Sequence, residues 1–106
     1  MAFKKDLSLL LLSDIKLSQR ELLGNNHVLI EGLISQNSNI IGKTLSQLNY
    51  REMYNSFVLA ISRQSELLRD KVAHIKLRFS DTLLIMIPKD KIESIREKND
   101  LIILEE

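Results

Sequence analysis

The sequence predicts a small α+β domain, a β-sheet with short helices after its first strand and one helix before its last strand. Two observations support this fold class. Short apolar runs bounded by turn residues recur along the chain, and polar segments with helix-capping spacing separate several of them. A length of 106 residues suits one domain with one modest core.

The first apolar run, Asp6–Asp14, is short and bracketed by acids, which indicates a buried strand. Residues 15–26 are polar and end in a Gly-Asn-Asn turn, which is typical of a linker. The stretch Lys5–Leu10 resembles Lys98–Leu104 near the other end. Either this similarity is chance, or the chain begins with the last strand of a preceding copy. We predict that residues 1–26 are the end of a preceding repeat plus a linker, and that 27–106 form the domain.

The run His27–Ile34 is the first strong strand. It carries apolar side chains on both faces, which predicts that both faces are covered. Gly32 inside it indicates a bulge or a close backbone approach.

Two short helical pieces are predicted next, because Thr44–Gln47 and Asn49–Glu52 both have capping-box spacing. Asn55 follows as the expected left-handed stop. The apolar side chains of this stretch, predicted to face inward, are Leu45, Leu48 and Met53.

Three further strands are predicted in the middle of the chain. Phe57–Ser62 is apolar on both faces and therefore central, and Glu66–Arg69 is a short strand in a polar hairpin or loop. Ile75, Leu77 and Phe79 alternate with basic residues, the period of a strand with one wet face.

The last elements are a strand, a helix and a strand. Ser80-Asp81 is a predicted turn before the central strand Thr82–Ile87. After Pro88, a third capping box at Asp90–Glu93 opens a helix that runs to about Lys98. Leu101–Glu106 is the predicted terminal strand.

The composition argues against several classes of function. The net charge is +1, aromatic residues make up 5% and tryptophan is absent, so we expect no nucleic-acid partner. Without cysteine there is no thiolate zinc site, and His27 and His74 lack metal-ligand spacing. We therefore expect no metal, no cofactor and no catalytic residue. The longest apolar run, Leu9–Leu12, is far too short to cross a bilayer, and the expected chain is soluble and cytoplasmic.

Three residues are candidates for binding a ligand or lining an interface: Arg51, Tyr54 and Arg63. Arg51 offers a planar fork that suits a carboxylate or a phosphate. The alternative is an ordinary ion pair on the helix surface. Gly42-Lys43-Thr44 resembles the end of a phosphate-binding loop, but helix capping by Thr44 explains it more simply.

The stretches IIGKTLSQLNYREMYNSFVLAISR and IKLRFSDTLLIMIPKDKIESI resemble the C-terminal domain of potassium-conductance regulators, the TrkA-C domain. The resemblance covers residues 28–104. With the strand motif at both ends, it is nearest to the tandem copies inside sodium-coupled dicarboxylate and sulfate permeases. The matching residues are Ile41, Gly42, Lys43, Thr44, Leu45, Leu48, Arg51, Glu52, Tyr54, Ala60, Ile61, Asp81, Leu83 and Leu84.

This resemblance implies a regulatory domain without catalytic activity, on the cytoplasmic side of an inner-membrane transporter. It implies a homodimer, with Leu45, Leu48 and Met53 at the seam, that contacts the parent's membrane domain and binds a small anionic effector between subunits. The alternative is a purely structural dimerisation module without a ligand.

The sequence departs from the family pattern at several positions. Asn55 replaces a glycine, and Ser80 replaces the glycine of a Gly-Asp turn. Members that bind cyclic di-AMP tend to have an aliphatic residue and an asparagine where this chain has Ser56 and Phe57. The resemblance therefore favours an anion other than cyclic di-AMP.

Overall fold

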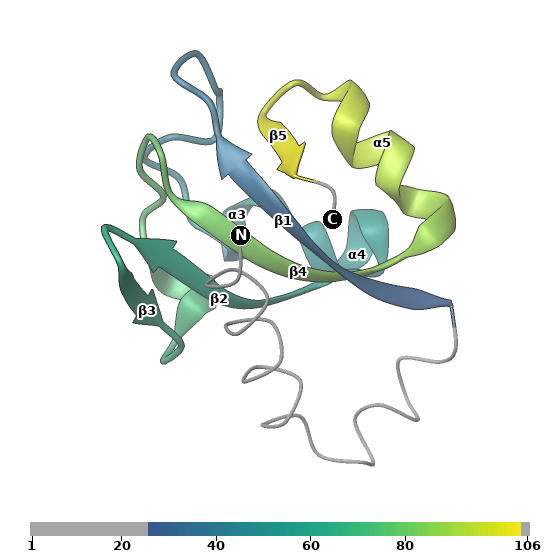
Figure 1. Ribbon diagram of the computed structural model, residues 1–106, viewed down its shortest axis with the longest axis horizontal. Helices are drawn as coiled ribbons and strands as arrows, with labels where there is room; N and C mark the ends of the chain where they lie inside the picture. Colours follow the sequence, from purple (N-terminus) through teal and green to yellow (C-terminus); the bar gives the residue numbers. More distant parts are fainter. Residues whose placement is uncertain (1–25, 105–106) are drawn as a thin grey trace.

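The computed structural model describes residues 26–104. The predicted strand at Asp6–Asp14 and nearly all of the predicted linker lie outside these residues, so the proposed repeat boundary stays a prediction. Figure 1 shows one twisted sheet with the short helices packed against one side of it.

The sheet has five antiparallel strands in the order β3-β2-β4-β1-β5. Their bounds are β1 His27–Ile34, β2 Phe57–Arg63, β3 Glu66–Leu68, β4 Thr82–Pro88 and β5 Leu101–Leu104. The α+β fold class is thereby confirmed, and all five strands lie at or within two residues of their predicted bounds.

The helices are short. They are α3 Leu45–Leu48, α4 Tyr50–Tyr54 and α5 Ile92–Glu97, with single 3-10 turns η1 Val72–His74 and η2 Lys89–Lys91. Helices of four to six residues are not stable on their own, so packing onto the sheet must hold them.

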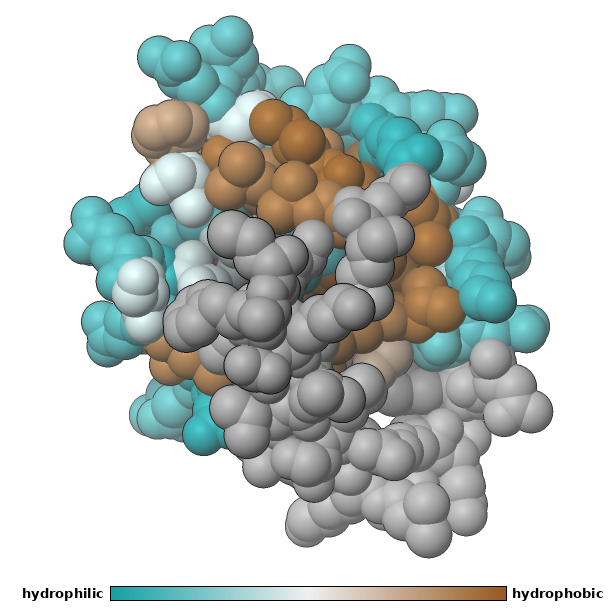
Figure 2. All heavy atoms as spheres, viewed as in Figure 1, coloured by the Kyte–Doolittle hydropathy of each residue, from teal (hydrophilic) through white to brown (hydrophobic). Residues whose placement is uncertain are grey.

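The main core lies between these helices and one face of the sheet. In the β1–β4 register, Val28 pairs with Ile87 and Ile30 with Ile85, and all four side chains belong to this core. The alternate residues Glu31 and Leu84 pair on the other face. Figure 2 shows that apolar residues also gather on the side of the molecule seen in Figure 1. The strands are thus apolar on both faces, as their sequence predicted.

Helix capping follows the prediction at one of three sites. Thr44 and Gln47 form a complete capping box, with the Thr44 amide donating to Gln47 Oε1 at 2.8 Å. Asn49 instead adopts a left-handed conformation and ends α3, so its predicted side-chain cap on α4 is wrong. The Asp90 box is also wrong, because η2 precedes α5 and Lys91 occupies its N-cap without a side-chain bond.

The predicted strand at Ile75–Phe79 is wrong. η1 ends just before this segment, which is irregular and leads into a turn, and only Leu77 pairs with another backbone segment, bonding to Gly42 and Lys43 at 2.8 Å each. Leu77 is buried, but Phe79 is 56% exposed, so the alternating pattern does not describe one buried face. The physical reason is that only Leu77 finds a distant backbone partner, so no ladder of strand hydrogen bonds forms along this segment.

Left-handed backbone conformations are common in the turns. Asn55 takes one at φ 49°, as predicted for a helix stop. The complete set of non-glycine residues with positive φ in residues 26–104 is Asn49, Asn55, Gln64, Ser65, Lys71, Ser80 and Asn99.

Gly32 provides space for the side chain of Leu101. A Cβ atom at position 32 would lie 3.0 Å from Leu101 Cδ1, on the strand next to β1. Leu101 is itself 3% exposed, so it cannot move away freely. The prediction of a bulge or a close backbone approach at this glycine is wrong in detail, because both registers run regularly through Gly32 and the close neighbour is a side chain.

We therefore expect Gly32→Val to lower the free energy of unfolding by about 1–3 kcal/mol through overpacking. Urea unfolding of Gly32→Val, Leu101→Ala and the double variant would measure it. The double variant should lose less stability than the two single variants together, because the shorter side chain at position 101 leaves space for the larger one at position 32. If the losses of stability are strictly additive, the contact between position 32 and Leu101 is not the cause of the destabilisation.

Candidate functional site

Helices α3 and α4, the start of β2 and η1 enclose an open groove of about 350 Å³. Its walls combine apolar and polar groups, which include Tyr50, Arg51, Ser56, Phe57, Val58 and His74. A register shift between Val58 and Ala60 marks a bulge in β2. Because of the bulge, Val58 and Ile61 both face the helices although three positions separate them.

Arg51 is the main candidate for binding an anion in this groove. Its guanidinium carbon lies 4.7 Å from the centre of the Phe57 ring, a cation–π arrangement. Arg51 is exposed, and within residues 26–104 no carboxylate forms an ion pair with it. The ring therefore orients the planar guanidinium while its N–H groups stay available to a phosphate or carboxylate.

Tyr54 lies in the core instead of the groove. Its ring packs edge-to-face on Tyr50 with centroids 5.3 Å apart, and the two residues are 4% and 7% exposed. Burial, followed by the charge of Asp100, raises the pKa of both phenols. Tyr54 is absent from the groove lining. We therefore expect the ring to support α4 without contacting a ligand.

Arg63 is engaged by Asp81. Arg63 Nε and Nη2 donate to the two carboxylate oxygens at 2.9 and 2.8 Å, and Nη2 also donates to the Lys76 carbonyl at 3.0 Å. The two side chains are 18% and 2% exposed. The hydrogen bond with Asp81 raises the pKa of Arg63.

The ion pair between Arg63 and Asp81 lies outside the groove but supports one of its walls. Arg63 does not line the groove, yet its bond to Lys76 holds the segment that follows η1, and η1 supplies one wall. The sequence predicts Asp81 as a turn residue that matches the family pattern, and its ion pair with Arg63 was not predicted. An arginine at the end of one apolar strand and an aspartate at the start of another were the available signal.

The three predicted interface residues differ in exposure. Leu45 is 7% exposed and belongs to the main core of its own protomer. Leu48 is half-buried against that core. Met53, on α4, is 49% exposed. Of the three, Met53 alone is a largely exposed apolar side chain.

Metal and membrane features are absent from the described part of the chain. Across residues 26–104 no three His, Cys, Asp or Glu side chains gather as metal ligands. The two histidines lie apart: His27 Nε2 is 3.2 Å from the Asn55 carbonyl, and His74 lines the groove. None of the helices within this range is long and apolar enough to cross a membrane.

We expect Asp81→Asn to lower the free energy of unfolding by about 3 kcal/mol, because it leaves Arg63 partly buried without its counter-charge. Chemical denaturation would measure the loss. The matched control is Glu93→Gln, which removes an exposed ion pair of similar length, 2.7 Å, to Arg96. That control should cost less than about 0.5 kcal/mol. Equal losses in the two variants would contradict the role given to Asp81.

The family model of the TrkA-C domain matches residues 29–99. An uncharacterized transporter of Synechocystis, sll0640, is 40% identical over 76 residues, which are 72% of this chain and 12% of that protein. Sodium/sulfate cotransporter 2 of Chlamydomonas reinhardtii is 29% identical over 77 residues, 73% of this chain and 9% of that protein. The chain thus corresponds to a small part of the length of these relatives.

Solved structures share the fold. The RCK C domain of the potassium transport protein KtrA, in complex with cyclic di-AMP, has a TM-score of 0.60 at 22% identity and covers 76% of this chain and 92% of its own. BusR of S. agalactiae, solved with its busAB promoter DNA, has a TM-score of 0.59 at 17% identity. The match covers 92% of this chain and 49% of BusR.

Proposed function

The chain belongs to the TrkA-C domain family, and we propose that it is a ligand-sensing and dimerising regulatory domain of a membrane ion or anion transporter. The observation that carries this proposal is the open groove in which Arg51, set over Phe57, has no carboxylate partner among residues 26–104. A small anionic effector fits this groove. The domain performs no catalysis and lies on the cytoplasmic side of an inner membrane.

The relatives support the transporter assignment. Two proteins that share this segment are named as transporters, and the segment is a small share of each. We propose that the membrane domain of the parent is the partner that the chain regulates. The predicted absence of a nucleic-acid partner stays a prediction: BusR was solved with promoter DNA, while a net charge of +1 gives this chain little electrostatic attraction to DNA.

The proposed mechanism is linkage between effector binding and the arrangement of two subunits. Arg51 and Met53 lie two positions apart on α4, so a ligand at the groove and a partner at Met53 act on the same helix. An effector that binds one dimer arrangement more tightly shifts the population toward it by its differential affinity. A domain dimer of BusR with cyclic di-AMP is a structural precedent for the assembly.

The site residues of this proposal are Arg51 for the effector, with Met53 and the edge of Leu48 for the partner subunit. Leu45 is left out because it is buried in its own protomer. Tyr54 and Arg63 support the site, since one is buried in the core and the other is paired with Asp81.

We expect Met53→Asp to weaken dimerisation by roughly 30-fold or more, because an unpaired carboxylate buried at a seam costs about 2 kcal/mol or more. Sedimentation equilibrium across a concentration series would measure it. Ile102→Asp is the matched control, since Ile102 is 51% exposed against 49% for Met53. A wild-type chain that stays monomeric at every concentration, or equal weakening in the control, would contradict this seam.

We expect Arg51→Gln to reduce anion affinity by about 10-fold or more, because it removes a charge-assisted hydrogen-bond donor. Titration calorimetry with phosphate, sulfate, succinate and cyclic di-AMP would test this, with Lys89→Gln as a control for the loss of one surface charge. If none of these anions binds while the dimer persists, the structural module without a ligand is the better account.

A further inference from the structure

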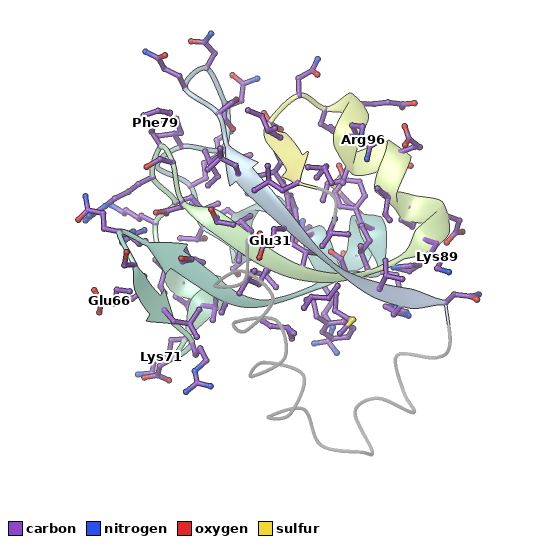
Figure 3. The ribbon with its side chains drawn as sticks, in the orientation of Figure 1. Glu31, Glu66, Lys71, Phe79, Lys89 and Arg96 are labelled. Carbon is purple, nitrogen blue, oxygen red and sulfur yellow. The ribbon has the colours of Figure 1, made fainter. Side chains whose placement is uncertain are left out.

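Two loops meet at one end of the sheet and expose large apolar side chains. The Gly42 amide donates to the Leu77 carbonyl and the Leu77 amide donates to the Lys43 carbonyl, each at 2.8 Å. This pairing sets residues 41–43 beside residues 76–79, which together we call the basic tip. Ile41 is 39% exposed and Phe79 56% exposed. Figure 3 shows Phe79 at the end of its loop, pointing away from the sheet.

Cationic side chains alternate with these apolar groups. Lys43, Lys76 and Arg78 are all exposed. Lys76 and Arg78 flank Leu77, whose side chain is buried, while both of their own side chains are exposed to solvent. Three cations and two large apolar side chains therefore share one small surface.

The nearby carboxylates do not neutralise this surface. Asp81 is 1% exposed, and its charge is balanced by Arg63. Within residues 26–104, Lys43, Lys76 and Arg78 form no ion pair with a carboxylate. The basic tip keeps a net positive charge.

The basic tip is held in place before it meets any partner. The Ile34 amide donates to the Asp81 carbonyl at 2.9 Å, and the Ser80 amide donates to the Ile34 carbonyl at 3.1 Å. In the other loop the Ile40 amide donates to Ser38 Oγ at 3.2 Å. Binding through a preformed surface avoids much of the entropy cost of ordering a loop.

We propose that the basic tip docks on a membrane surface that contains anionic lipid. Phe79 and Ile41 enter the headgroup region, while Lys43, Lys76 and Arg78 contact lipid phosphates. A protein partner would need an acidic, apolar groove of matching shape, whereas a lipid surface supplies both chemistries without a matched shape.

The strength of this contact suits a domain that is already close to a membrane. Each cation near an anionic surface increases partitioning about fivefold, so three cations contribute about a hundredfold. A hundredfold increase in partitioning gives only weak membrane binding for a free protein. It is sufficient for a domain tethered to a transporter, because tethering raises the effective concentration. The inference needs neither the groove nor the dimer, so its failure would leave the proposed function untouched.

The test uses the absence of tryptophan from the chain. Phe79→Trp places the only tryptophan at the basic tip, and Ile102→Trp places it at another exposed position. Vesicles of phosphatidylcholine and phosphatidylglycerol in equal parts should shift the tryptophan emission of the Phe79→Trp variant to the blue. The same vesicles should leave the emission of the Ile102→Trp variant unchanged. Vesicles of phosphatidylcholine alone should give a much smaller shift for Phe79→Trp.

Single charge removals in the Phe79→Trp background test the cations. Lys76→Gln should lower partitioning into the mixed vesicles about fivefold. Lys89→Gln should not, since Lys89 lies at the opposite end of the molecule from Phe79 (Figure 3). Circular dichroism and urea unfolding would check that each variant folds as the wild type does.

Three results would overturn the proposal. They are no blue shift for the Phe79→Trp variant, an equal shift with phosphatidylcholine alone, and equal losses for Lys76→Gln and Lys89→Gln. A tip variant that changes the sedimentation equilibrium without changing lipid partitioning would assign the basic tip to a second copy of the chain instead.

Discussion

The carboxylate of Asp81 accepts hydrogen bonds from the Arg63 guanidinium at 2.8 and 2.9 Å and from the Arg78 amide at 2.9 Å. Because the Asp81 side chain is only 2% exposed, its bonds form away from water, where each is stronger and the loss of a partner is costly. The Asp81 carbonyl meanwhile accepts from the Ile34 amide. One residue thus joins the ends of β1, β2 and β4, and the chain that leads to this junction supplies both η1 and part of the basic tip.

The groove and the basic tip use arginine and lysine in different ways. At the groove, Arg51 is held over an aromatic ring beside half-buried apolar walls, which suits recognition of one small ligand with defined geometry. At the basic tip, Lys43 and Lys76 are exposed to solvent, which suits an extended charged surface. Arg63 is a third case, since its charge is balanced inside the protein. Formal net charge alone would not separate these three roles.

The four longer strands were predictable because each is a mainly apolar run between turn residues, and such runs are stabilised by burial in a sheet. The irregular structure at Ile75–Phe79 was not predictable, because its alternation resembles a strand although only Leu77 finds a distant backbone partner. Arg51 could be proposed from its residue type and the family pattern. The partner of Arg63 was missed, because Asp81 lies 18 residues away and the charges at the two strand ends point to a pair only once the sheet register is known.

The left-handed turns have a consequence for how this chain can vary. Seven non-glycine residues have positive φ angles in residues 26–104. This conformation is unfavourable for most side chains because the Cβ atom lies too close to the backbone. Asparagine tolerates it best, because its short polar side chain can bond to the local backbone, whereas the side chains of Gln64 and Lys71 are longer. Replacing such residues in the loops by glycine or asparagine is therefore expected to stabilise the fold. Substitutions at Gln64, Ser65 or Lys71 would leave the groove lining and the basic tip unchanged, because none of the three belongs to either.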